Sequence, residues 1–160
     1  MSSVTINIDN LEETLRVGRR LGAALQVGHV IGLIGPLGSG KTTLVKGMAD
    51  GAGVKDLRLV NSPTFVIINE YEVWDRKPPL HIHHIDTYRL HGSRDLEALG
   101  FEELCGDGAV VIEWAERVSD LLPSDALTIT IEPVDENRRR FHCRCGGVAS
   151  AVLLAALRGK

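Results

Sequence analysis

Hydrophobic residues follow two different periods along the chain. Near the N-terminus apolar residues alternate with polar ones, which predicts a half-buried strand, and leucines then recur at helical spacing. Asp9 or Asn10 can cap that helix, and Gly28 is its expected end. The same reading predicts further helices at residues 41–52, 95–104 and 148–157, and strands at residues 4–8, 29–34, 57–60, 65–71, 80–85, 109–112, 127–132 and 140–145.

Two of the predicted strands, at residues 29–34 and 109–112, are too apolar for a sheet with one face in water. Strands of this kind, mixed with helices, favour a three-layer α/β fold with a mostly parallel central sheet. The last two strands alternate in polarity and are close in sequence, so they are expected to form an antiparallel pair.

Length and charge exclude several classes of protein for this sequence. At 160 residues the chain is expected to be one domain, residues 1–160. Lysine and arginine number 18 against 21 acidic residues, a net charge of −3, which argues against a domain that grips nucleic acid on its own. The three cysteines show no disulfide or metal pattern. With no secretory signal and no apolar run long enough to span a bilayer, we expect a cytoplasmic protein without membrane contact.

The most informative stretch is a phosphate-binding loop of the pattern GxxxxGK[ST], between a predicted buried strand and a helix. Its backbone N–H groups and the helix N-terminus can surround a phosphate. Lys41 can reach the β- and γ-phosphates of ATP, and the Thr42 hydroxyl can ligate Mg²⁺. A glycine-rich turn that only caps a helix is the weaker alternative. The residues expected to bind the nucleotide are Gly35, Pro36, Leu37, Gly38, Ser39, Gly40, Lys41, Thr42 and Thr43.

Such a loop needs a carboxylate for its Mg²⁺, normally at the end of a neighbouring strand. Asp86 follows one predicted strand and Glu113 follows another. Either can bind the metal directly or through water, or orient the attacking water; the alternatives are a turn cap for Asp86 and a surface acid for Glu113. Thr64, in the segment Ser62-Pro63-Thr64, can sense the γ-phosphate as switch segments do, although a simple proline turn would look the same.

Other polar clusters carry weaker signals. His81 and His83 share one strand face and His84 the other, but no ligand at zinc spacing accompanies them, so we expect no metal there. Trp114 is read as a packing residue. Cys105 is interpreted as a small core residue, and Cys143 and Cys145 as one face of a strand. The arginines at 138–140 are interpreted as a solvated face, with contact to phosphate or RNA as the alternative.

Several motifs occur in one order: GPLGSGKTT, NSPTF, HIDTYRL and IEWAE. In this order they closely resemble the TsaE family, small bacterial ATPases of tRNA threonylcarbamoyladenosine biosynthesis. The resemblance implies a P-loop fold and a protein that binds and hydrolyses ATP. The family works with a pair of partner proteins that transfer a threonylcarbamoyl group to the adenosine beside the anticodon of ANN-decoding tRNAs.

The resemblance also implies roles for particular residues. Lys41 and the loop hold ATP, Thr42 and Glu113 ligate Mg²⁺, and Asp86 is a further metal-binding or water-positioning carboxylate. The segments around Thr64 and Trp114 match the family's two switch-like regions. Pro36 departs from the family, which commonly has aspartate there, and it removes a backbone donor.

Two other functions remain alternatives. A stand-alone P-loop kinase for a small molecule would fit the loop and the small size. A nucleotide-gated scaffold would use ATP only to order a binding surface. The absence of an NKxD motif argues against a GTPase, and the absence of an LSGGQ signature argues against a transporter-type ATPase.

Overall fold

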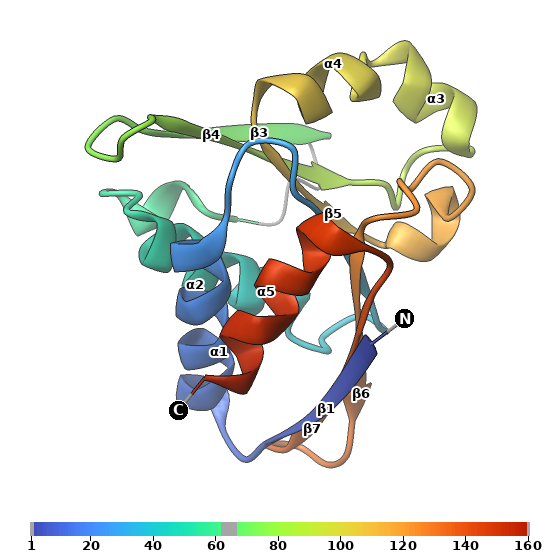
Figure 1. Cartoon of the computed structure of the whole chain (residues 1–160). Helices are drawn as coiled ribbons and strands as arrows, with labels where there is room; N and C mark the ends of the chain where they lie inside the picture. Colours follow the sequence, from blue (N-terminus) through green and yellow to red (C-terminus); the bar gives the residue numbers. More distant parts are fainter. Residues whose placement is uncertain (1, 62–66, 160) are drawn as a thin grey trace.

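The computed structural model describes residues 2–61 and 67–159. One sheet of seven strands runs through this described part of the chain, in the order β1-β7-β6-β2-β5-β4-β3 (Figure 1). The strands are β1 (Ser2–Ile8), β2 (Val30–Ile34), β3 (Ile68–Val73), β4 (Leu80–Asp86), β5 (Ala109–Glu113), β6 (Leu127–Pro133) and β7 (Arg139–Cys145). The helices are α1 (Leu11–Ala24), α2 (Lys41–Ala52), α3 (Ser93–Ala98), α4 (Phe101–Asp107) and α5 (Val148–Arg158), with short 3₁₀ helices η1 (Leu57–Leu59) and η2 (Ala115–Val118).

The centre of the sheet is parallel and both edges are antiparallel. Strands β6, β2, β5 and β4 run in the same direction, whereas β7 and β1 on one side and β3 on the other run against their neighbours. The predicted α/β fold with antiparallel C-terminal strands is therefore confirmed. The strands β1 and β3 were also predicted, but their antiparallel pairing at the edges of the sheet was not.

Helices cover both faces of the sheet, as a three-layer fold requires. Helices α1, α2 and α5 pack on one face around the larger hydrophobic core, and α3, α4 and η2 pack on the other around a smaller core (Figure 1). Because both faces are covered, β2 and β5 are buried along almost their whole length. This burial explains why their sequences are continuously apolar.

The helix α1 begins as the sequence predicts. Asn10 is its capping residue, and the side-chain oxygen of Asn10 accepts a hydrogen bond of 3.0 Å from the Glu13 backbone N–H. The helix ends at Ala24, before the predicted stop at Gly28, which instead forms the turn into β2 with φ of +92°. No helix in the described part of the chain is long and apolar enough to cross a membrane.

Three further predicted elements differ from the structure in type or extent. Residues 57–60 form a 3₁₀ turn, which Asp56 caps by accepting from the Arg58 backbone N–H, rather than a strand. The helix predicted for residues 95–104 is two helices, because Gly100 adopts φ of +84° and turns the chain between them. The described part of the strand predicted at residues 65–71 begins at Ile68 and continues to Val73.

Candidate nucleotide-binding site

The phosphate-binding loop lies between the buried strand β2 and the N-terminus of α2, as predicted. Gly38 and Gly40 have φ of +77° and +106°, a conformation that glycine adopts without steric cost. Gly40 caps α2 without a side-chain hydrogen bond, so the first N–H groups of the helix are not satisfied by a capping side chain. Together with the helix dipole, these donors make the loop suited to an anion such as a phosphate.

Lys41 is held inside the loop. Its ammonium group donates hydrogen bonds of 2.5 Å and 3.0 Å to the carbonyl oxygens of Gly35 and Pro36. The Lys41 Nζ also lies 4.0 Å from the centre of the Trp114 ring, within cation–π distance. Burial lowers the pKa of Lys41, while the carboxylates of Glu113, Glu116 and Asp86 oppose that shift. The position of this side chain fits the predicted role of contacting a phosphate.

Thr42 and Glu113 meet directly, although 71 positions separate them in the sequence. The Thr42 hydroxyl donates to the Glu113 carboxylate, with Oγ1 lying 3.0 Å and 3.2 Å from its two oxygens. Glu113 is 2% exposed, at the carboxyl end of β5 beside β2. A hydroxyl and a carboxylate at this distance are the hard oxygen ligands that Mg²⁺ prefers, so the residues fit a magnesium ion bound next to the phosphates.

Asp86 ends the strand next to the one that carries Glu113. The two residues are direct neighbours in the parallel pairing of β4 and β5. Asp86 is also buried, and its carboxylate accepts a hydrogen bond of 2.8 Å from the Tyr88 backbone N–H. The structure thus brings Lys41, Thr42, Asp86 and Glu113 to the carboxyl ends of adjacent parallel strands, where α/β sheets bind their ligands.

A buried histidine behind Glu113 was missed by the sequence reading. His84 is 0% exposed, and its Nε2 lies 2.5 Å from Oε2 of Glu113. On its other side, Nδ1 lies 2.8 Å from the hydroxyl of Tyr71 on β3. Burial raises the pKa of Tyr71 to about 12, and its hydroxyl pairs with Nδ1 of His84. Because an ionised carboxylate can only accept a hydrogen bond, Nε2–H of His84 donates to Glu113 and orients it.

Trp114 has an unusual backbone conformation at the edge of the site. Its φ is +60°, a strained region for a bulky residue that is over-represented at functional sites. The Thr87 hydroxyl donates a hydrogen bond of 2.6 Å to the Trp114 carbonyl oxygen. The half-buried ring packs 4.9 Å from the Tyr88 ring, which agrees with its interpretation as a packing residue. Its position against Lys41 places it within the site as well.

One arginine of the segment 138–140 supports the loop instead of forming part of a solvated face. The Arg139 Nε–H donates a hydrogen bond of 3.0 Å to the backbone carbonyl oxygen of Ser39. Arg138 instead pairs with Asp135, at 2.6 Å, on the exposed turn. The prediction for this segment therefore holds for Arg138 but is wrong for Arg139. Contact with phosphate or RNA stays untested.

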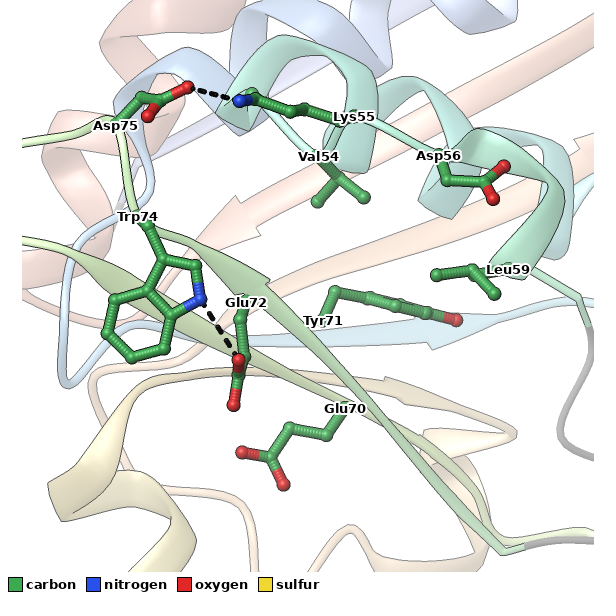
Figure 2. A pocket seen from close by; sticks show the side chains of 10 residues that line it. Val54, Lys55, Asp56, Leu59, Glu70, Tyr71, Glu72, Trp74 and Asp75 are labelled. Carbon is green, nitrogen blue, oxygen red and sulfur yellow. Dashed lines mark hydrogen bonds and ion pairs between the residues drawn. The ribbon is translucent and has the colours of Figure 1, made fainter.

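The loop lines a cavity of about 360 Å³ together with Glu113 and Trp114. A larger hollow of about 490 Å³ lies elsewhere, between η1 and β3, and is lined by Leu59, Trp74 and acidic side chains (Figure 2). The chemistry of the loop, rather than cavity size, identifies the nucleotide site. The predicted switch segment Ser62-Pro63-Thr64 lies outside the described residues.

The remaining sequence interpretations are mostly confirmed. His81 and His83 share one face of β4 and His84 faces the opposite side, toward Glu113. Cys143 and Cys145 are buried on one face of β7, and Cys105 is partly buried against the smaller core. All three cysteines have free thiols in the structure.

Comparison with known proteins agrees with this geometry. Residues 8–141 match the family model described as threonylcarbamoyl adenosine biosynthesis protein TsaE. A Bacillus subtilis (strain 168) protein named tRNA threonylcarbamoyladenosine biosynthesis protein TsaE is 40% identical over 82% of this chain and 79% of its own length. A Streptomyces coelicolor protein of the same name is 40% identical over 72% of this chain and 76% of its own length.

A solved structure shows the same fold. The crystal structure of Bacillus subtilis YdiB aligns with a TM-score of 0.78 at 30% sequence identity, covering 98% of this chain and 95% of that one. The phosphate-binding loop, the sheet and the family match thus agree along nearly the whole chain, and the chain belongs to the TsaE family of tRNA threonylcarbamoyladenosine biosynthesis proteins.

Proposed function

We propose that this chain binds ATP with Mg²⁺ at the loop of residues 35–43 and hydrolyses it in the biosynthesis of threonylcarbamoyladenosine in ANN-decoding tRNAs. The observation that carries the proposal is the contact between Thr42 and Glu113 at the mouth of the loop, in a member of the TsaE family. On this view the acyl transfer belongs to the partner pair of threonylcarbamoyl-transferase proteins, which also bring the tRNA. ATP hydrolysis by this chain resets that complex between cycles.

Each residue of the site has a task in this proposal. The backbone N–H groups from Gly35 to Thr43 and the ammonium of Lys41 bind the phosphates. Thr42 and Glu113 hold Mg²⁺, which neutralises developing charge on the phosphate oxygens. Asp86 is a second carboxylate close to this centre and either contributes to the metal site or orients the attacking water. His84 keeps the Glu113 carboxylate turned toward Thr42.

We infer that hydrolysis by the isolated chain is slow. Among the described cations near the loop, Arg117 stacks on the Tyr88 ring, with its guanidinium carbon 4.9 Å from the ring centre, and Arg139 donates a hydrogen bond to the Ser39 carbonyl oxygen. P-loop enzymes that lack a cation over the transferred phosphoryl group gain about 10³–10⁵ in rate when a partner supplies one. The transferase pair is the proposed source of that stimulation. Thr64 is proposed as the switch residue that reports the nucleotide state to it.

The proposal further treats residues 1–160 as a single ATPase domain that works in the cytoplasm, where tRNA is modified. Its pocket is open to solvent along the loop, where Leu37 is 89% exposed. An exposed apolar residue at the tip of the phosphate loop is suited to contact a partner protein that senses the nucleotide.

The test of this function uses cells in which the chain is the sole source of its activity. Lys41→Ala removes the phosphate-binding ammonium, while Lys46→Ala, on the exposed face of the same helix, is the matched control. We expect threonylcarbamoyladenosine in tRNA to disappear with Lys41→Ala and to remain normal with Lys46→Ala. Melting curves of both purified variants establish that they fold. Normal levels of the modified nucleoside with Lys41→Ala would refute the proposal.

A further inference from the structure

Four potential metal ligands gather at the end of β4 that is remote from the phosphate loop. His81 and His83 project from one face of β4, and Glu70 projects from the same face of the neighbouring β3, directly across from His83. Asp107 is the last residue of α4, just before β5, and its carboxylate lies beside His83. Figure 2 shows the carboxylates of Glu70 and Glu72 on the side of β3 opposite to the ring of Tyr71.

The distances among these side chains match those within a metal coordination shell. The Asp107 Oδ2 lies 3.0 Å from Nε2 of His83 and 3.3 Å from Nδ1 of His81, and that Nδ1 lies 3.2 Å from Oε1 of Glu70. Ligand atoms in a tetrahedron around zinc, with bonds of about 2.0–2.1 Å, are separated by about 3.3 Å. A carboxylate oxygen of Glu70, one of Asp107 and a ring nitrogen of His83 also lie within 4.8 Å of one another, whereas His81 forms such a group with Glu70 and Glu72.

Hydrogen bonding satisfies only part of this cluster: His83 Nε2 and the Asp107 carboxylate form a hydrogen bond of 3.0 Å, but two other ring nitrogens lack partners among the described residues. The Nδ1 atom of His81 is buried and makes no hydrogen bond within the described residues, although two carboxylate oxygens lie close to it. His83 is 2% exposed, and its Nδ1 also lacks a partner in that part of the chain. A metal ion would bind these ring nitrogens in their unprotonated form and would offset the repulsion between their lone pairs and those of the carboxylate oxygens.

We propose that Glu70, His83 and Asp107, together with the adjacent His81, form a binding site for a divalent transition-metal ion, with zinc as the preferred ion. Two imidazoles and two carboxylates are a donor set that zinc accepts. The ion joins the C-terminus of α4 to the β3–β4 hairpin, and its function is to hold these elements together. Glu70 and Asp107 are 49% and 53% exposed, so the ion can enter from solvent.

The site is separate from the proposed nucleotide site. His81 and Asp86 stand five positions apart on one strand, which corresponds to about 17 Å at 3.3 Å per residue. Gly108 allows Asp107 to approach β4 so closely, because a Cβ atom on Gly108 would lie only 2.2 Å from the His81 carbonyl oxygen. The ligands come from three separate segments, which explains why no zinc spacing is visible along the sequence.

The test is an equilibrium titration of the nucleotide-free protein with Zn²⁺ against a chromophoric chelator. We expect one ion per chain, with affinity reduced at least tenfold in His81→Gln and in Asp107→Asn. His142→Gln is the matched control, since His142 also contacts a carboxylate, Glu132, at 2.8 Å but on the exposed face of β7. Its affinity should equal that of the unchanged protein. Equal affinity in all four proteins, or the absence of saturable binding, would overturn the proposal.

A second readout identifies the ligands. Cobalt(II) in the site should show the visible absorption of a tetrahedral ion without a thiolate charge-transfer band. Cys105 is the nearby thiol to exclude; burial raises its pKa to about 11, so it stays protonated at neutral pH. A charge-transfer band that disappears in Cys105→Ser would place the ion at the thiol and contradict the proposal. Unchanged ATP turnover in Asp107→Asn would separate this site from the function proposed above.

Discussion

At the scale of single residues, the orientation of Glu113 is the central feature of the proposed site. Its carboxylate contacts the Thr42 hydroxyl on one side and the His84 ring on the other. The ring is in turn fixed by the Tyr71 hydroxyl. A buried chain of this kind fixes the direction of a metal-binding carboxylate before the metal arrives, and residues that orient ligands in this way strongly affect affinity.

Replacement of His84 tests this arrangement. In His84→Ala the carboxylate loses its donor, and we expect the Mg²⁺ concentration for half-maximal ATP turnover to rise about 10–100-fold. His84→Gln keeps an N–H donor toward Glu113 and should recover much of the loss. The measurement is a Mg²⁺ titration of turnover in the presence of the transferase pair. An unchanged Mg²⁺ requirement in His84→Ala would show that the ring only fills the core.

The sequence supports the prediction of some of these residues but not others. Lys41 and Thr42 belong to a local motif, and Asp86 and Glu113 end apolar strands, so each has a signal nearby in sequence. His84 and Arg139 have none, because their partners lie 29 and 100 positions away. Because side chains along β4 point alternately to the two faces of the sheet, the sequence does place His84 on the face opposite to His81 and His83. Only the pairing of β4 with β5 reveals that its face meets Glu113.

At the scale of elements, close packing between α1 and α2 supports the helix that carries Lys41. Glycines on both helices allow their backbones to approach. A Cβ atom on Gly22 would lie 1.9 Å from the Met48 carbonyl oxygen, and one on Gly51 would lie 2.0 Å from the carbonyl oxygen of Arg19. Side chains cannot fit at such distances, so the helices must separate if either glycine is replaced.

Gly22→Ala is therefore expected to lower the free energy of unfolding by about 1–3 kcal/mol, the usual cost of overpacking, despite the better helix propensity of alanine. Gly106→Ala is the matched control, because Gly106 is helical and a Cβ atom there meets nothing within 4 Å. That variant should be more stable by about 0.5–1 kcal/mol. Urea denaturation measures both. Equal stabilities in the two variants would contradict the packing argument.

Elements bounded by clear sequence motifs were predicted well, whereas elements interrupted by a turn at a single residue were not. The limits of α2 follow from the loop before it and Gly53 after it, and they match the structure. The break at Gly100 and the turn capped by Asp56 interrupt patterns that look regular along the sequence. In both places the backbone is set by one residue, whereas periodicity is a property of a whole window.

At the scale of the whole molecule, one buried histidine links stability to pH. His29 is buried, and its Nδ1 accepts a hydrogen bond of 3.1 Å from the Gln26 backbone N–H. Burial lowers the pKa of His29, an effect that the carboxylate of Asp125 partly opposes. The unfolded chain therefore binds a proton at higher pH than the folded one does. The stabilisation is complete above the unfolded pKa of about 6.5 and is lost as pH falls through the folded pKa.

His29→Asn tests this linkage, since the asparagine side-chain oxygen keeps an acceptor for Gln26 but does not titrate. We expect the stability of the unchanged protein, relative to His29→Asn, to decrease as pH falls from about 7.5 to 5. The contributions of the other histidines to the pH dependence of stability are the same in both proteins and cancel in this difference. The free energy of unfolding by urea at several pH values provides the measurement, and a difference that stays constant or grows at low pH would be contrary to this account.

The order of the strands determines where the proposed site forms. Strands β2, β5 and β4 are adjacent and parallel, so their carboxyl ends bring the loop, Glu113 and Asp86 to one edge. Local patterns predicted the strands themselves, but the order in the sheet depends on contacts between residues far apart in sequence. The antiparallel edges β1 and β3 complete the sheet on either side of this centre.

The most direct test of the proposed function is phosphate release from ATP–Mg²⁺ by the chain alone and with the transferase pair and tRNA. We predict slow release alone and a rise of about 10³-fold or more with the full assembly. Glu113→Gln should abolish that rise without lowering the melting temperature substantially. Release that does not respond to the assembly, or that persists in Glu113→Gln, would contradict the proposed role of this site.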